Sequence, residues 1–263
     1  MPGPVRHGHR LGLIAAGILL VGLALAATGA LAWHASVRRD QRQAFQTAAT
    51  EVSETTETLL RRDTDFVGTL STVLTRQPGL SGGAFNQWYT ELEGWQRQVG
   101  GLGTIVVRSV PAAHLRSFLA HRDGEPAFQV LIDGKVLPVA ANGRSRDCLI
   151  STGETITSLT PGFASELQGD WCQASSRIGR TQAPLQSLAA ETGGLLAFPA
   201  FADGVHTLFL EQAFYGLGAQ ASTVAQHRAA VNGWVVSSFD TAALLDTALA
   251  GHHGLGASLY HTN

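Results

Sequence analysis

An uncharged run of 23 residues, from Leu11 to Trp33, most constrains what this chain can fold into. As a helix it would rise ~35 Å, enough to cross a hydrocarbon core of ~30 Å with some tilt. Trp33 closes the run, as is typical of an aromatic residue at a membrane interface. A cleaved signal peptide is the alternative, because Ala30-Leu31-Ala32 is a small-x-small pattern, but its apolar region is typically only ~7–15 residues long. The run therefore predicts a retained transmembrane helix over residues 11–33.

The basic residues around this run do not determine its orientation. Arg6 and Arg10 precede it, whereas Arg38, Arg39 and Arg42 follow it, so the positive-inside rule gives no support for an N-terminus inside. The cysteine pair and the long polar C-terminal part favour export. We expect a cytoplasmic tail over residues 1–10, a single pass through the cell membrane, and an extracytoplasmic location for the rest.

Charge is low along the whole chain. Charged residues make up 14% of the sequence and the net charge is -2, so no basic surface for nucleic acid is expected. We expect no nucleic-acid partner. The part after Trp33 is long enough for one large domain or two small ones.

The two cysteines, Cys148 and Cys172, both follow the apolar run. An even pair without C-x-x-C spacing indicates a structural disulfide in an oxidising compartment. Two unrelated buried thiols are the alternative. We predict the disulfide.

A long helix is predicted over residues 34–77, which contain no proline and one glycine. Apolar residues recur every seven positions, which keeps one stripe on one side of the helix. The stripe consists of Phe45, Val52, Leu59, Phe66 and Val73. Asp63 interrupts the companion positions, so we expect this stalk helix to pack partly on a dimer mate and partly on its own domain. Packing on the domain alone is the alternative.

Beyond Pro78-Gly79, which should end the helix, short strands and helices mix without a regular βαβ rhythm. The patterns predict helices over 85–99, from Pro111, over 184–190 and over 241–249, the last capped by Asp240. They predict strands over 104–107, 148–151, 195–198, 207–215, 233–239 and 257–260, and a hairpin over 128–139 with Asp133-Gly134 at its turn. The fold class expected is α+β with antiparallel sheets.

No catalytic signature was convincing. Residues 79–83 match G-x-S-x-G, but a nucleophile elbow needs a preceding strand, and here a helix and Pro78 precede it. His252-His253, with His261 nearby, lack the spacing of a metal site, and no nucleotide-binding glycine motif is present. We expect no catalytic residues, no metal, no cofactor and no enzyme activity in this chain.

The last third of the chain resembles the CHASE domain, the extracytoplasmic sensor of membrane histidine kinases and diguanylate cyclases. The resemblance is carried by the segments 188–193, Phe198-Pro199, 213–218 and 226–235, which read LAAETG, FP, AFYGLG and QHRAAVNGWV. Ala213-Phe214-Tyr215 stands where the family usually has Pro-Val-Tyr, and His227-Arg228 where it has Arg-Arg. Asp170-Trp171-Cys172 with the upstream Cys148 resembles actinobacterial members.

The resemblance implies a sensor domain over residues 78–263, with two PAS-like subdomains at about 78–200 (distal) and 201–263 (proximal). It implies that the distal subdomain binds a small ligand and that Asp147 could be its polar anchor, although a plain surface or turn aspartate is equally compatible. Phe198 falls where cytokinin receptors have a threonine, which argues against cytokinin as the ligand. The expected partners are a small molecule, the membrane and a second copy of the chain through the stalk.

The chain ends at Asn263 without a kinase or cyclase motif. We therefore expect the sensory part of a longer signal-transduction receptor. A stand-alone membrane-anchored binding protein is the first alternative, and an exported hydrolase the second.

Overall fold

A computed structural model describes residues 7–122, 131–132, 135–136, 145–155, 170–172, 177–202, 205–219 and 221–260. The chain divides into two compact units, residues 1–54 and 55–263, and the helix α1 (His7–Arg76) contributes to both. The predicted transmembrane and stalk helices are thus one uninterrupted helix, which ends just before Pro78 as expected.

In the first unit, the part of α1 from Ile18 to Trp33 is apolar and exposed. The stretch from Ile18 to Trp33 carries large apolar side chains that are 59% to 74% exposed. In length and composition this is a possible single membrane span near the N-terminus.

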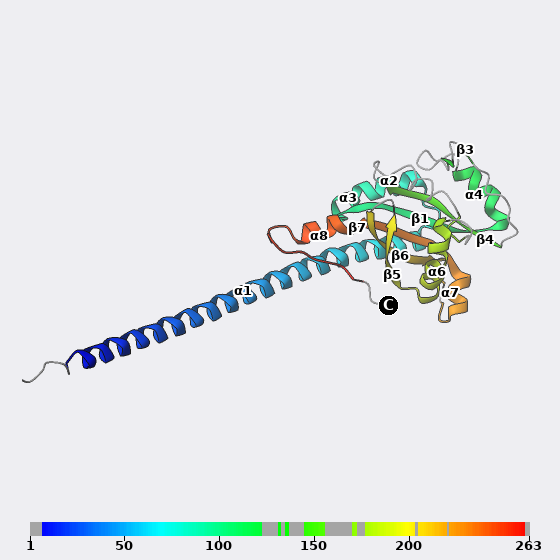
Figure 1. Cartoon of the computed structure of the whole chain (residues 1–263). Helices are drawn as coiled ribbons and strands as arrows, with labels where there is room; N and C mark the ends of the chain where they lie inside the picture. The colour runs from blue at the N-terminus through cyan, green and yellow to red at the C-terminus, as the bar shows by residue number, and fades with distance from the viewer. Residues whose placement is uncertain are drawn as a thin grey trace, which may run out of the picture. The chain divides into compact units, whose positions relative to one another are not determined.

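The second unit is α+β and is built on one five-stranded sheet, with the strand order β4-β1-β7-β6-β5 and antiparallel pairing throughout (Figure 1). The strands are β1 (Gly101–Pro111), β4 (Arg146–Thr155), β5 (Leu195–Ala202), β6 (Val205–Tyr215) and β7 (Val231–Asp240). A separate pair, β2 (Leu131–Ile132) and β3 (Lys135–Val136), is the described part of the predicted hairpin; its turn and the rest of 128–139 lie outside the described residues.

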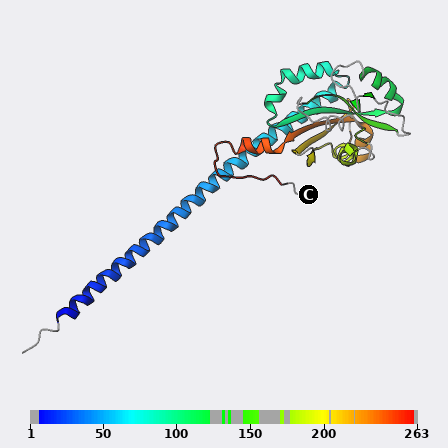
Figure 2. The ribbon, with the colours of Figure 1, turned by 45° about the horizontal axis from the view of Figure 1, so that its top comes forward.

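The helices of this unit are short apart from α1 and α6. They are α2 (Gly82–Glu91), α3 (Gly94–Arg97), the 3₁₀ turn η1 (Ala112–His114), α4 (Leu115–Arg122), α6 (Arg177–Thr192), α7 (Val224–Ala230) and α8 (Thr241–Ala248). Both faces of the sheet are covered: α6 lies on one face, and α2 on the other (Figure 2).

The face of the sheet opposite α6 packs on the C-terminal part of α1. The buried residues of α1 there are Phe66, Val67, Leu70 and Leu74, a spacing that follows the helical period rather than a strict heptad. Ser71 Oγ also donates a buried hydrogen bond of 2.9 Å to the carbonyl oxygen of Ala213 on β6. The predicted stripe is therefore only partly buried: Phe66 lies in this core, whereas Phe45 is 58% exposed. Asp63, predicted to interrupt the companion positions, is itself buried.

Three expectations about local structure were wrong, and one helix was not expected. The helix predicted over 85–99 is two helices, because Glu93 adopts a left-handed conformation with φ of 54° between α2 and α3. Pro184 lies inside α6 rather than in its first turn, although Gly193 ends that helix with φ of 66° as predicted. Residues 257–260 form no strand. Helix α7 was not predicted, although Thr223 and Gln226 form a capping box at its start.

The expected division into two subdomains, each with its own sheet, is not confirmed. The strands from residues 101–155 and from 195–240 form one sheet, and the expected boundary near residue 200 lies within β5.

Candidate functional site

A cavity of about 340 Å³ lies between α6 and the sheet, next to the disulfide. Its lining comes from β1, β4, α6, α7 and β7, and includes Arg146, Cys148, Gln186 and Trp234. This volume is at the lower end of the range of small-molecule pockets, ~300–1,000 Å³. We call this space the α6 cavity.

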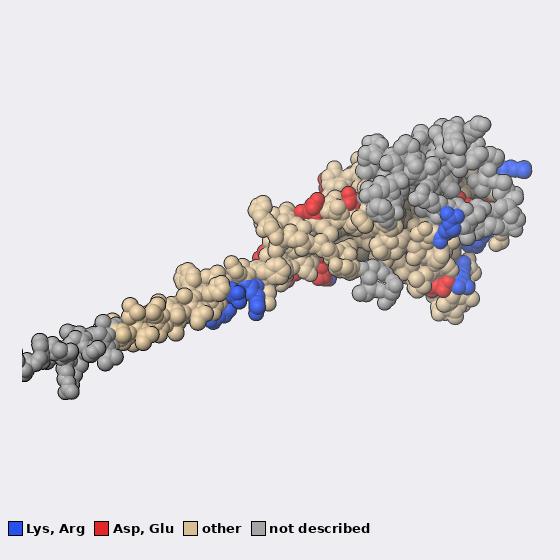
Figure 3. Space-filling model, viewed as in Figure 1, with Lys and Arg blue, Asp and Glu red and all other residues tan. Residues whose placement is uncertain are grey.

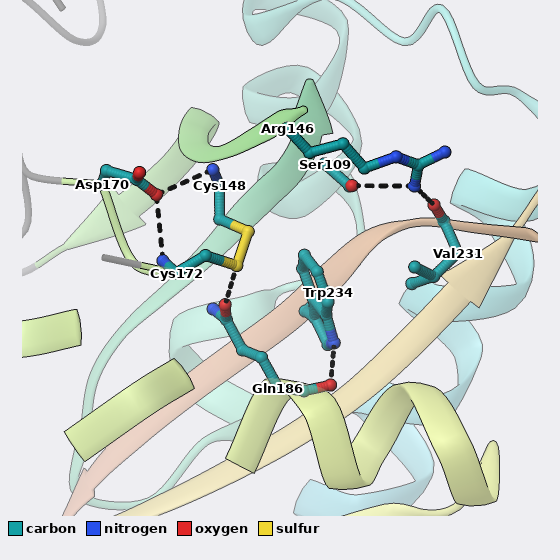
Figure 4. Close-up of a disulfide and its surroundings, with 8 residues drawn as sticks. All are labelled: Ser109, Arg146, Cys148, Asp170, Cys172, Gln186, Val231 and Trp234. Atoms are coloured by element: carbon teal, nitrogen blue, oxygen red, sulfur yellow. Dashed lines mark hydrogen bonds between the residues drawn. A yellow bond between two sulfur atoms is a disulfide. The ribbon is translucent and has the colours of Figure 1, made fainter. Parts of the chain in front are cut away.

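The predicted disulfide between Cys148 and Cys172 is present, with the two Cα atoms 5.2 Å apart. Asp170 fixes both of its ends, because its Oδ1 accepts hydrogen bonds from the backbone N–H of Cys148 at 2.9 Å and of Cys172 at 3.0 Å (Figure 4). The Trp171 N–H also donates to the carbonyl oxygen of Cys148 at 2.9 Å. The segment 170–172 is thereby held against the edge strand β4. The carboxylate and the two cysteines lie close enough for a metal site, but both thiols are consumed by the disulfide.

Gln186 on α6 connects the disulfide to the sheet (Figure 4). One end of its side-chain amide lies 3.1 Å from Cys172 Sγ. Because a disulfide sulfur carries no hydrogen, we assign the amide NH₂ group to this contact. The other amide atom is buried without a hydrogen-bond partner, and Gln186 is only 1% exposed. The backbone carbonyl of Gln186 accepts a 2.9 Å hydrogen bond from Trp234 Nε1.

Two arginines lie at the cavity. Arg146 donates from one guanidinium nitrogen to Ser109 Oγ at 3.1 Å and to the carbonyl oxygen of Val231 at 3.2 Å. Arg228 on α7 forms an ion pair of 2.5 Å with Glu191 at the end of α6. Hydrogen bonds from Arg228 and Ser187 lower the pKa of the Glu191 carboxyl below its ordinary value. Two positively charged side chains thus border the cavity, and the ion pair with Glu191 already neutralises the charge of Arg228.

Glu211 on β6 is the most unusual charged residue of this face. It is 0% exposed, and neither carboxylate oxygen has a hydrogen-bond partner in the described part of the chain. Its strand neighbours across the sheet are Leu196 and Val236, both in the core beneath α6. Burial raises the pKa of Glu211 well above its ordinary value, because the charged form loses its hydration. A neutral carboxylic acid is therefore the favoured form in this core.

The structure does not bring the two predicted ligand residues together. Asp147 lies on the edge strand β4, is buried, and belongs to the same face of that strand as Leu149, away from α6. Phe198 lies on the opposite edge strand, β5, where it stacks on Phe209 with ring centroids 5.2 Å apart beneath α6. Neither residue lines the α6 cavity.

Ser81, the serine of the G-x-S-x-G match, has a structural role. Its side chain caps α2 by accepting a hydrogen bond from the Ala84 N–H at 3.2 Å. The helix α1, not a strand, precedes it, as the sequence indicated.

Sequence reasoning missed Gln186, Trp234 and Glu211. Glu211 was detectable, since it interrupts the apolar strand run from Leu208 to Tyr215 at a position that alternates with Phe209 and Ala213. Gln186 and Trp234 carry no such signal, because an apolar cavity leaves no spacing in the sequence.

Comparison with known proteins identifies no family for this chain. The sequence matches no protein-family model, and no curated protein is significantly similar to it.

Proposed function

We propose that this protein is the membrane-anchored, extracytoplasmic sensor of a signal-transduction receptor, and that the α6 cavity binds its ligand. The observation that carries the proposal is the buried amide of Gln186, which lines the cavity and has one polar atom without a partner. Buried polar groups are nearly always hydrogen-bonded, so an unpaired atom on a side chain that lines a cavity supports a ligand that completes it.

The sheet topology supports a PAS-like sensor. Counted along the chain, its five strands lie in the order 2-1-5-4-3 in one antiparallel sheet with helices on both faces, which is compatible with the PAS-like α+β domain that the CHASE resemblance implies. This one sheet contains strands from both parts of the chain, which the CHASE resemblance implied to be separate subdomains. We therefore propose a CHASE-like sensor reduced to a single PAS-like sheet in the described residues.

The lining favours a small, mostly apolar or planar molecule. The Trp234 ring and Ala190 give apolar surface, and Gln186 and Arg146 give polar contacts at one side. On the face drawn in Figure 3, basic side chains form a group on α1, and the other charged side chains of the described residues are scattered. Both arginines at the cavity already have partners within the chain, which fits a ligand of low charge.

Signalling requires that the ligand bind one arrangement of the protein better than another, since equal affinity shifts no equilibrium. The hydrogen bond from Ser71 on α1 to Ala213 on β6 supports a link between the sheet and the stalk helix. We further propose that two copies associate through the stalk, where Phe45 leaves an apolar side chain exposed.

A ligand screen tests this function. The full chain in lipid nanodiscs is melted with a library of planar metabolites, and a true ligand at a hundred times its Kd adds ~2.7 kcal/mol to the stability. Ala183→Phe fills the α6 cavity and should abolish the shift. Leu188→Phe, at an exposed position of the same helix, is the matched control and should keep it. A shift that survives Ala183→Phe, or no shift with any compound, contradicts the proposal.

A further inference from the structure

A second, larger cavity of about 560 Å³ lies between the start of α2, the end of β1 and α4. It shares only Ser109 with the α6 cavity. We call it the Arg108 cavity, after the one arginine in its lining. No aspartate or glutamate is among the described residues that line it.

Arg108 is a half-buried cation without a counter-ion. In the described part of the chain its guanidinium makes no hydrogen bond or ion pair, and its one specific contact is with the Phe214 ring, whose centroid lies 5.0 Å away. Burial lowers the pKa of Arg108 to about 10, so the group is still charged at neutral pH. A buried or half-buried charge without a partner is costly, because the water it loses is not replaced.

Close packing around Gly233 leaves space for the Arg108 side chain and for the ring that it contacts. Gly233 faces Arg108 across the β1–β7 pair, and a Cβ at Gly233 would collide with the carbonyl oxygen of Val107 and with the Phe214 ring. The missing side chain thus leaves room for the ring on which the guanidinium lies. Phe214 is fully buried and belongs to the core beneath α1 and α2.

Several other polar groups of the cavity can donate hydrogen bonds, although the hydroxyls of Ser117 and Ser151 already donate to backbone carbonyl oxygens. The hydroxyl oxygen of Ser81 already accepts from the Ala84 N–H, and that of Ser109 accepts from Arg146, so the hydrogen of each hydroxyl remains to donate. Asn232 and His114 add two further side chains that can donate. Apolar surface from Leu80 and Phe118 completes the lining.

We propose that the Arg108 cavity binds a small organic anion, whose carboxylate or phosphate oxygens pair with the guanidinium while an apolar body contacts Leu80 and Phe118. The fork of guanidinium donors matches either oxyanion in a bidentate arrangement. This site is separate from the ligand site proposed above, so each can fail without the other.

The test uses the full chain in lipid nanodiscs, with inorganic phosphate, acetate and benzoate as probes at constant ionic strength. Melting temperature is followed against the concentration of each probe, with the neutral benzamide as the comparison for benzoate. We expect a saturable rise with at least one anion and none with benzamide. A response to phosphate alone identifies a phosphate site, and a response to acetate or benzoate identifies a carboxylate site.

Arg108→Gln should weaken the apparent affinity about 10-fold or more, as expected for losing a charge-assisted hydrogen bond. Arg61→Gln removes the same charge from an exposed surface position and should leave the affinity unchanged. Ser117→Trp keeps Arg108 and should block the cavity, which gives a second reading if Arg108→Gln does not fold. Ala183→Phe should retain the anion response, because it fills only the α6 cavity. Equal responses in wild type, Arg108→Gln and Ser117→Trp, or no response to any anion, would overturn the proposal.

Discussion

The indole Nε1 of Trp234 on β7 donates a 2.9 Å hydrogen bond to the backbone carbonyl of Gln186 on α6. This bond joins the centre of the sheet to the helix that covers the α6 cavity. Trp234 is only 4% exposed, so both the ring and its polar atom are committed to this contact. Because the same helix carries the amide that lies against the disulfide, Trp234, Gln186 and Cys172 form one continuous wall of the cavity.

Trp234→Phe should destabilise the protein by ~1–3 kcal/mol, because it removes the hydrogen bond and leaves a void beneath α6. Denaturant unfolding of the full chain measures the loss. Trp88→Phe is the control, since Trp88 is half-buried and stacks on Phe66 at 6.4 Å from the other side of the sheet. An equal loss in the two variants would show that the hydrogen bond to Gln186 adds no stability beyond the loss of indole packing.

The disulfide closes a loop between Cys148 and Cys172, which are 24 positions apart. Replacing both cysteines by serine should cost roughly 3 kcal/mol in the chain-entropy model. Unreduced peptide mass spectrometry of the protein from its native compartment should show the linked pair. Two free thiols there would contradict both the disulfide and the extracytoplasmic location that we propose.

Glu211→Gln should stabilise the protein at neutral pH. The buried acid has a raised pKa, so the native state binds its proton more tightly than the unfolded chain does. Stability is then greatest below the unfolded pKa, near ~4.3, and falls as pH rises towards the folded value. Glutamine removes this loss, which is about 1.4 kcal/mol for each unit of pKa shift. Glu91→Gln is the control, because Glu91 is exposed on α2. A variant less stable than wild type at pH 8 would indicate a charged partner for Glu211.

Cysteine scanning along residues 45–73 tests the proposed dimer. If a mate packs on the predicted stripe, disulfide cross-links between copies should form at stripe positions that are not buried within one copy, such as 45, but not at 52, because Val52 is only 7% exposed. Cysteine at position 66 should not cross-link, because Phe66 lies in the core of its own unit. Uniform or absent cross-linking would leave packing on the domain as the only role of the stripe.

Local structure was largely predictable because its signals are short-range. The Asp240 cap of α8, the left-handed Gly193 after α6 and the end of α1 before Pro78 each depend on a few neighbouring residues. The disulfide was predictable from the count of two cysteines. The break at Glu93 was not, since a left-handed glutamate has no sequence signature.

The strand order could not be predicted from the sequence, because it depends on pairing between distant segments. β1 lies between β4 and β7, so its neighbours are separated from it by up to 138 positions, as for Gly101 and Phe239. The separation of Asp147 and Phe198, both predicted to be ligand-binding, has the same origin, because the two residues lie on opposite edge strands. Arg108 and Glu211 were recognisable in the sequence as ionisable residues within apolar strands. Their lack of partners depends on the fold and could not be predicted.

The last prediction concerns Asp63, which lies on α1 and is 2% exposed. Burial raises the pKa of Asp63 to about 7, although the neighbouring Arg62 lowers it. Because the folded pKa lies above the ordinary value of 3.8, the native state holds more protons than the unfolded state between about pH 4 and pH 7. The contribution of Asp63 to stability is therefore full below pH 4, declines as pH rises to 7, and is constant above that.

Asp63→Asn should flatten this part of the profile, so that the difference in unfolding free energy between wild type and variant changes by ~4 kcal/mol from pH 4 to pH 8. Asp65→Asn is the matched control, since Asp65 is exposed two positions further along the same helix. Denaturant melts at half-unit pH steps give the difference directly, and they separate Asp63 from Glu211, which is unchanged in both variants. A constant difference across this range would mean that Asp63 is ionised in the folded protein and that a charged or hydrogen-bonding partner compensates its burial.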